Sequence, residues 1–497
     1  MVGGKGRWVG GLVLLLILLG SIGEQGRAWA AGESAENKKA VATPDPEDKI
    51  TPLRGLEHLS RESATCASCH REKSPGLYQQ WGASRHFTAN VGCYECHKAE
   101  PGDADAIKHK DFTISTIVSP KDCATCHKRE VSEFDRSHHA TGAQILGSLD
   151  NVLAEVVEGA PLLNGQSPVV VSGCASCHGA FVKVRSDGTL DPATWPNSGI
   201  GRINPDGSKG SCAACHMRHS FSVAQARHPN TCGRCHLGPD HPQKEVYEES
   251  QHGITFFANQ GAMNLGSAKW MPGEDYITGP TCATCHISAN RDLPVTHDVG
   301  ERISWDLRSP ISVRIDERDA KKGRENTRSW LERRKDMKTV CNSCHSRTFA
   351  DNFYEQLDAF VTLYNEKFAK PGAKLMKLMT EEGLLTKTQF DDKLEWTWFY
   401  LWHHEGRRAR HGAAMNGPDY AHWHGMFEVA NRFYMEMVPE IREAIEKAEH
   451  AGKKDGAAKV RAALEEILNS DYHKWFLGVK SQGQDAKPAD VKSHAGK

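Results

Sequence analysis

The sequence predicts a mainly α-helical protein in two parts, a loop-rich region that carries eight Cys-x-x-Cys-His motifs and a helical region after it. Three observations support this fold class. The motifs use all 16 cysteines of the chain. From about residue 352 to residue 469, apolar side chains recur at helical spacing, as Phe353, Leu357, Phe360 and Leu363 do. Runs with the alternating pattern of strands are almost absent.

Residues 1–30 have the order of a secretory signal peptide. Lys5 and Arg7 precede the apolar run 9–19, and Ala28-Trp29-Ala30 resembles a cleavage site. The run is shorter than the roughly 20 residues that a membrane-spanning helix needs. We therefore expect cleavage after Ala30 and a soluble protein in the periplasm. The formal net charge of -1 gives no electrostatic reason to bind nucleic acid.

The rest of the chain divides by composition. Residues 31–60 are polar and predict a flexible lead-in. Residues 61–350 carry the motifs at unequal intervals, separated by stretches rich in Gly, Pro, Asn and Asp, and predict the motif-bearing domain. Residues 351–470 predict a C-terminal helical domain of three or four long helices, punctuated by Pro371, Gly383 and Pro439. Residues 471–497 predict a polar tail.

The motif itself predicts covalent c-type haem. Its two thiols can form thioethers with the two vinyl groups of one porphyrin, and the histidine that follows can bind the iron. One copy could be a redox dithiol or half a zinc site, but eight copies with no cysteine left over indicate an octahaem cytochrome c with eight covalent haems. The attachment cysteines are Cys66, Cys69, Cys93, Cys96, Cys123, Cys126, Cys174, Cys177, Cys212, Cys215, Cys232, Cys235, Cys282, Cys285, Cys341 and Cys344. The motif histidines are His70, His97, His127, His178, His216, His236, His286 and His345.

Histidines outside the motifs are candidates for the second axial position. An electron-transfer haem usually has a second ligand, whereas a catalytic haem leaves that position open to substrate. The chain has 26 histidines, of which the predicted distal ligands are His86, His109, His138, His219, His252, His297 and His404. The residues leave open whether His138 or His139 binds iron, and whether His404 or His411 does. Arg407, Arg408 and Arg410 lie in the same stretch and suit haem propionates.

Eight motifs in this order, followed by Gly-Pro-Asp-Tyr-Ala-His-Trp-His-Gly at 417–425, resemble the hydroxylamine oxidoreductase family over essentially the whole mature chain. The resemblance implies a homotrimer in which seven haems have two histidine ligands and the fourth haem, here at His178, is catalytic. It also implies a covalent bond from Tyr420 of a neighbouring subunit to that porphyrin, as in oxidising members, and a distal Asp240–His241 pair. The segment 179–211 between the fourth and fifth motifs is longer than in the nitrifier enzymes, which indicates a different branch of the family.

The function that follows is oxidation of hydroxylamine, a small nitrogenous substrate, to nitric oxide or nitrite. Asp240 and His241 would accept the protons, and the other haems would carry electrons to a soluble or membrane-linked cytochrome c. Three alternatives stay open: reduction of nitrite or hydroxylamine to ammonia at the same haem, oxidation of hydrazine, and electron transfer without catalysis.

Overall fold

The computed structural model describes residues 53–479 apart from 148–152, 154–155, 157–167 and 325–327. The expected signal peptide, most of the lead-in and the end of the tail lie outside these residues. The described residues belong to one compact unit. None of their helices is long and apolar enough to cross a membrane.

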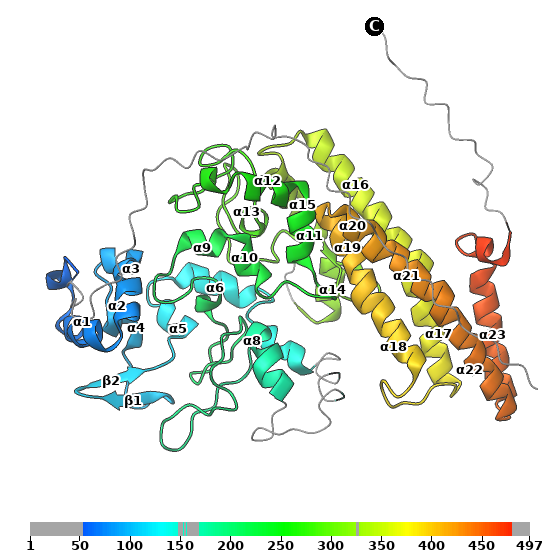
Figure 1. Cartoon of the computed structure of the whole chain (residues 1–497), viewed down its shortest axis with the longest axis horizontal. Coiled ribbons are helices and arrows are strands. Elements are labelled where there is room, and N and C mark those ends of the chain that lie inside the picture. Colours follow the sequence, from blue (N-terminus) through cyan, green and yellow to red (C-terminus); the bar gives the residue numbers. More distant parts are fainter. Residues whose placement is uncertain (1–52, 148–152, 154–155, 157–167, 325–327, 480–497) are drawn as a thin grey trace, which may run out of the picture. The chain divides into compact units, whose positions relative to one another are not determined.

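The predicted mainly α-helical fold is confirmed, and the elements before residue 346 are short (Figure 1). The helices of this region are η1 (Leu56–His58), α1 (Arg61–Lys73), α2 (Pro75–Gly82), α3 (Arg85–Thr88), α4 (Cys93–His97), α5 (Pro120–Cys123), α6 (Lys128–Arg136), η2 (Gly142–Gly147), η3 (Val170–Cys174), α8 (Ala175–His178), η4 (Cys212–Ala214), α9 (Val223–Arg227), α10 (Pro229–Gly233), α11 (Gln243–Glu249), α12 (Gln251–Ala258), η5 (Gln260–Ala262), α13 (Cys282–His286), α14 (Ile315–Lys321) and α15 (Trp330–Cys341). The same region also contains two short antiparallel β-ribbons. They pair β1 (Ala106–His109) with β2 (Phe112–Ser115), and β3 (Trp305–Asp306) with β4 (Val313–Arg314).

Helical turns shape the Cys-x-x-Cys-His motifs. The His127 amide donates to the Cys123 carbonyl at 2.8 Å, and His216, His236 and His345 donate to Cys212, Cys232 and Cys341 at 2.9–3.0 Å. In such a turn, residues three and four positions apart lie on the same face. Each of these turns therefore presents both thiols and the imidazole to one side, as attachment to a single porphyrin requires.

After residue 346 the described chain forms four continuous helical runs, within the three or four helices that the sequence predicts. The first joins α16 (Arg347–Tyr364), π-helical η6 (Asn365–Ala369) and α17 (Lys370–Glu381). The second joins α18 (Lys393–Phe399), π-helical η7 (Tyr400–Glu405) and α19 (Gly406–Met415). The third joins α20 (Pro418–Ala421), π-helical η8 (His422–Phe427), α21 (Glu428–Asn431), π-helical η9 (Arg432–Met437) and α22 (Val438–His450). The fourth is α23 (Lys454–Leu468), and the short η10 (Lys474–Leu477) follows it.

Pro371 and Pro439, which the sequence predicts to punctuate this region, lie in the first turns of α17 and α22, and neither interrupts its helical run. Each follows directly on a π-helical stretch, η6 before Pro371 and η9 before Pro439. Proline lacks an N–H and is tolerated in the first turn of an α-helix, where that donor has no intrahelical acceptor. The change from π to α hydrogen bonding supplies such a first turn, so both helices continue.

The largest apolar core lies among these four runs. Buried side chains such as Leu375, Leu401, Phe433, Ile441 and Leu464 form one cluster. A smaller cluster in the motif-bearing region contains Tyr247, Phe256, Met263, Trp270 and Tyr276.

Candidate haem sites and candidate active site

The structure places histidine rings opposite motif histidines at a spacing that fits an iron between them. A metal–imidazole bond is about 2 Å long, so two rings that share one metal have centroids roughly 6 Å apart. Six pairs of a motif histidine and another histidine have this separation among the described residues, and one of them, His236–His241 at 6.3 Å, shares His236 with another pair. Five pairs give each motif histidine a different partner. They are His70–His109 (6.2 Å), His97–His219 (6.4 Å), His127–His86 (6.2 Å), His236–His139 (6.1 Å) and His345–His252 (6.1 Å). The residues present therefore fit haems with two histidine ligands at the first, second, third, sixth and eighth motifs.

Backbone acceptors orient some of the motif histidines. Nδ1 of His97 lies 2.8 Å from the Ser115 carbonyl on β2, and Nδ1 of His286 lies 3.2 Å from the Val299 carbonyl. Metal-binding histidines usually donate their other ring N–H in this way, which fixes the tautomer. Nε2 of both rings is then the nitrogen available to iron.

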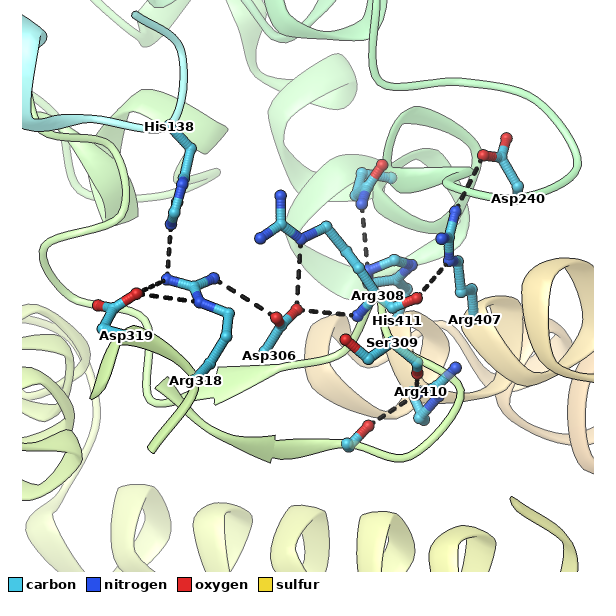
Figure 2. Close-up of polar contacts among 12 residues, drawn as sticks. His138, Asp240, Asp306, Arg308, Ser309, Arg318, Asp319, Arg407, Arg410 and His411 are labelled. Carbon is cyan, nitrogen blue, oxygen red and sulfur yellow. Dashed lines mark hydrogen bonds and ion pairs between the residues drawn. The ribbon is translucent and has the colours of Figure 1, made fainter. Parts of the chain in front are cut away.

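His139, and not His138, faces a motif histidine. The His138 ring instead points to Arg318, with Nε2 at 2.6 Å (Figure 2). Its Nδ1 lies 3.4 Å from Arg324. Consecutive residues in a turn point in different directions, so only one of the two can reach the iron. Sequence reasoning could not choose, because both residues have the same small polar surroundings.

For the histidines of the fifth and seventh motifs, electrostatics and helix packing indicate the second histidine less directly than a ring pair does. Burial, and next to it the charge of His297, lowers the pKa of His216 to about 4, which places His297 near the fifth motif. His228 lies between α9 and α10, which both pack against α13, the helix of the seventh motif. It also lines a cavity of about 410 Å³. The sequence analysis missed His228, although its position four residues before the sixth motif could have indicated it.

Interactions between thiols give the order of the motifs in space. Cys123–Cys212 and Cys232–Cys282 are hydrogen-bond partners. Electrostatic interactions link the other neighbouring motifs, through Cys66–Cys93, Cys96–Cys123, Cys215–Cys232 and Cys285–Cys341. The fourth motif joins this line at the sixth, where Cys177 and Cys235 are hydrogen-bond partners. The attachment sites thus form one line, with the fourth site as a branch.

Asp240 and His241 lie at that branch. Nδ1 of His241 donates to the Asp240 carboxylate at 2.5 Å, and Nε2 lies 3.0 Å from the Cys235 carbonyl. His241 also interacts electrostatically with Cys177 of the fourth motif. The pair that the resemblance implies therefore lies beside both the fourth and the sixth motifs.

Charge fixes the protonation of the pair. Burial opposes ionisation of Asp240, but the hydrogen bond from His241 and the charges of His241, His403 and Arg407 outweigh it and hold the pKa of this carboxyl below its usual range. Burial likewise disfavours the His241 cation, but the hydrogen bond and charge of Asp240 raise the pKa of His241 above its ordinary value. Because both ring nitrogens of His241 face acceptors, the imidazolium form satisfies this geometry.

One face of η7 and α19 lies against the Asp240–His241 pair. His403, Arg407 and His411 follow one another at intervals of four residues, which places them on the same side of the helix. Nη1 of Arg407 lies 3.2 Å from Asp240, and Nε2 of His403 lies 3.9 Å from the same carboxylate oxygen. His411 is buried, and its Nε2 lies 3.2 Å from the side-chain amide of Gln243 (Figure 2).

The three arginines of this stretch contact protein groups, although the sequence indicated haem propionates. Arg407 also donates from Nε to the Arg308 carbonyl at 2.8 Å, and Arg408 pairs with Glu428 at 2.6 Å. Arg410 is fully buried and donates to carbonyl or hydroxyl oxygens of four residues. These acceptors are Trp402, Gly406, Ser309 and Ser312. Arg407 and Arg410 therefore hold α19 against the loop between β3 and β4.

Two further predicted site residues are His404, which interacts electrostatically with Asp240, and Tyr420. Among the described residues, the ring of His404 contacts those of Phe399, Tyr400 and His403, and no contact between His404 and a motif histidine is seen. Tyr420, on α20, donates its amide to Glu249 at 3.3 Å. α20 packs closely against α19 at Gly412, where a Cβ would meet the Tyr420 and Ala421 backbone.

The chain resembles known multihaem cytochromes. A family model described as "Seven times multi-haem cytochrome CxxCH" matches residues 198–392, and a model of cytochrome c554 and c-prime matches residues 122–201. A probable nitrite reductase–hydroxylamine oxidoreductase fusion protein of Kuenenia stuttgartiensis is 24% identical over 363 residues. That match covers 64% of this chain, and this chain spans only 38% of the fusion protein.

Two solved structures have a related fold. A structure titled "Hypothetical multiheme protein" is 27% identical, with a TM-score of 0.67 over 79% of this chain and 98% of that chain. A reducing HAO-like protein complex of Kuenenia stuttgartiensis is 18% identical, with a TM-score of 0.52 over 83% of this chain and 88% of that chain. These matches and the motif geometry support a multihaem cytochrome c with covalent haem and a redox role.

Proposed function

We propose that this protein is a redox enzyme that oxidises hydroxylamine at the fourth of eight haems, the one attached at Cys174 and Cys177. The observation that supports this most is the Asp240–His241 pair beside the fourth motif, a hydrogen-bonded carboxylate and imidazole with opposite pKa shifts. A pure electron carrier has no use for such a pair, whereas chemistry at a substrate nitrogen needs protons to move.

The two members of the pair have different roles. Asp240 stays ionised because His241, His403 and Arg407 surround it, so it orients and does not store the proton. His241 is the proton carrier, since the carboxylate makes its imidazole a stronger base than free histidine. Haem iron supplies an open coordination position for the substrate nitrogen and accepts electrons. Oxidation of hydroxylamine to nitric oxide releases one proton with each electron. His241 would accept each proton from its neutral form, become the imidazolium that its two acceptors satisfy, and release the proton before it accepts the next.

The order of the motifs gives the electrons a route. From the fourth site they would pass to the sixth, because Cys177 and Cys235 are in contact. The line then continues through the fifth, third, second and first motifs on one side, and through the seventh and eighth on the other. A cytochrome c acceptor would dock at an end of this line.

Reduction of nitrite or hydroxylamine to ammonia is the second candidate. It is favoured by the hydrogen bonds of His241, whose two nitrogens both face acceptors, so that the imidazolium is poised to deliver a proton. The distant relative's printed name also joins nitrite reductase to hydroxylamine oxidoreductase.

Product analysis separates the two directions. With hydroxylamine and an oxidised acceptor, the proposal expects nitric oxide or nitrite together with acceptor reduction. With nitrite and a reduced donor, the second candidate expects ammonia to form faster than hydroxylamine is oxidised in the first assay. If neither substrate turns over, and no high-spin ferric EPR signal responds to hydroxylamine, the protein is an electron carrier and the proposal is wrong.

The predicted homotrimer and the Tyr420 link to a neighbour's haem are part of the oxidative proposal. Denaturing gel electrophoresis with haem staining tests both. Oxidation predicts a haem-positive band at trimer mass that survives boiling and reductant, and that Tyr420→Phe converts to monomer. A wild-type monomer band would contradict the link.

A further inference from the structure

The cluster of charges around His138 has no role in the function proposed above (Figure 2). It is built from the loop that begins at β3, from α14 and from the segment after it. Asp306 pairs with Arg308 at 3.3 Å and with Arg318 at 3.5 Å. Asp319 pairs with Arg318 at 2.5 Å and with Arg324 at 3.6 Å.

Positive charge is in excess in this cluster. The two carboxylates are 4% exposed, and Arg318 between them is 6% exposed. Three guanidinium groups and the nearby Lys322 therefore face two carboxylates. Burial, and next to it the charges of Arg308 and Arg318, lower the pKa of Lys322, which is the sign expected where cations outnumber anions. Arg333 also reaches Asp319, but Asp298 lies near it as a second anion.

His138 lies against two of these arginines, with its Nε2 2.6 Å from Arg318 and its Nδ1 3.4 Å from Arg324. Asp306, Asp319 and Arg318 are buried and paired with one another, whereas Arg308, Arg324 and Lys322 are partly exposed. Four cations share two carboxylates, so the cluster carries an excess of two positive charges.

The cluster lies beside a haem site. His139, the next residue, has its ring 6.1 Å from that of His236, the histidine of the sixth motif. A haem carries two propionates, which extend from the edge of the porphyrin, and planar guanidinium groups bind carboxylates in two-pronged contacts. The excess of two positive charges equals the charge of the two propionates of one haem.

We propose that Arg308, Arg318 and Arg324, with His138, bind the propionates of the haem attached at the sixth motif. The inference rests on haem attachment alone and holds for either direction of the proposed reaction. In this arrangement the cluster raises the midpoint potential of that haem, because nearby positive charge stabilises the electron-rich reduced state. The sixth haem is the one that would take electrons from the fourth.

The test is a redox titration of the haem-loaded protein, followed by absorbance and by EPR of the individual low-spin haems. Arg324→Gln and Arg308→Gln are the variants of choice, since both side chains are partly exposed and less needed for folding than Arg318. Arg328→Gln is the matched control. This arginine has two carboxylates of its own, Asp336 at 2.7 Å and Glu301 at 3.3 Å.

The proposal expects the midpoint potential of one haem to fall in both variants, while its g-values and the haem content stay unchanged and the control matches wild type. Unchanged potentials would overturn it. Altered g-values would also overturn it, because the arginines would then act by holding the iron ligand. A free anion is the rival occupant. If inorganic phosphate shifts the wild-type titration but not that of Arg324→Gln, the cluster binds anions from solution and not propionates.

Discussion

The region before residue 346 and the region after it are held together by different forces. After residue 346, long helical runs enclose one apolar core that includes Leu375, Phe433 and Ile441. Before it, helices of a few residues alternate with loops, and the ring pairs and thiols of the motifs converge on spaces that fit porphyrins. Polypeptide packing forms the core of the helical region. The motif-bearing region has a smaller apolar cluster of its own, and we expect its covalent haems to supply much of the remaining core. The candidate active site lies where the two meet, because η7 and α19 bring His403 and Arg407 to Asp240.

The largest effect should come from removing a haem at the centre of the line. Cys232→Ser with Cys235→Ser deletes the attachment site that contacts the fourth, fifth and seventh motifs. We expect complete loss of turnover and a much lower melting temperature for the motif-bearing region, because the haem is part of its core.

The matched control is the pair Cys66→Ser and Cys69→Ser at the end of the line. It should lose one haem, with a smaller change in melting temperature. Haem content, circular dichroism and turnover measure the effect. Equal destabilisation by the central and terminal pairs would contradict a haem-built core.

Arg407→Gln tests the contact between the two regions. It removes the guanidinium that helps to keep Asp240 ionised and that donates to the Arg308 carbonyl. Loss of one charge-assisted contact is worth about 1.5–3 kcal/mol, so we expect turnover to fall roughly tenfold or more. Arg407 stabilises the Asp240 carboxylate and opposes the His241 cation, so the pKa values of both groups rise without it. The acid limb of the pH–rate profile follows His241, the proton carrier, and should move to higher pH.

Arg461→Gln controls for the general loss of a surface charge, because Arg461 forms an exposed pair with Glu449 on the far helices. Its turnover and pH profile should match wild type. An unchanged pH profile in Arg407→Gln would show that the arginine does not act through Asp240.

Leu375→Ala tests the apolar core of the helical region. Leu375 is fully buried, and truncation of a buried leucine costs about 2–5 kcal/mol. Thermal or denaturant unfolding should show this loss, while haem midpoint potentials should stay unchanged because no described residue of this core belongs to a Cys-x-x-Cys-His motif. Shifted potentials would mean that the two regions do not have separate cores.

The sequence predicted the fold class and the second region well, because apolar periodicity reports helices directly. It predicted that Pro371 and Pro439 punctuate this region, whereas the helical runs continue through both, since periodicity does not show the π-helical turns before them. For the site, the motifs fixed the attachment residues. They could not separate His138 from His139, because that choice depends on how the turn after α6 directs two adjacent rings.

Other features of the site depend on tertiary contacts that no local pattern shows. As an arginine in a histidine-rich stretch, Arg410 suits a haem propionate by residue type. Its N–H groups, however, donate to carbonyl and hydroxyl oxygens of the β3–β4 loop and of its own helix. His228 carries no local signal beyond its distance from a motif, and its relation to the seventh motif follows only from the packing of α9 and α10 on α13.

A further prediction concerns the pH dependence of stability in the helical region. His473 is 1% exposed, its Nδ1 lies 2.8 Å from the Tyr434 hydroxyl, and burial lowers its pKa to about 4. The unfolded chain binds a proton near pH 6.5 and the folded chain only near pH 4, so stability is fully present above pH 6.5 and is lost as the pH falls towards 4. The loss should be on the order of 3 kcal/mol.

Denaturant unfolding between pH 7 and pH 4 measures this loss. His473→Phe should flatten the slope of stability against pH, whereas replacing the exposed His450 with glutamine should leave it unchanged. A slope that survives in His473→Phe would assign the pH dependence to other groups.

The most direct test of the catalytic assignment is the turnover of His241→Ala with hydroxylamine as substrate, compared with reduction of the same variant by dithionite. The account predicts that turnover falls by about 10²–10⁴-fold, the usual contribution of a general acid–base group. Haem content and the extent of reduction by dithionite should stay at wild-type values. Full turnover in His241→Ala would contradict the assignment of the Asp240–His241 pair as the proton-transfer site.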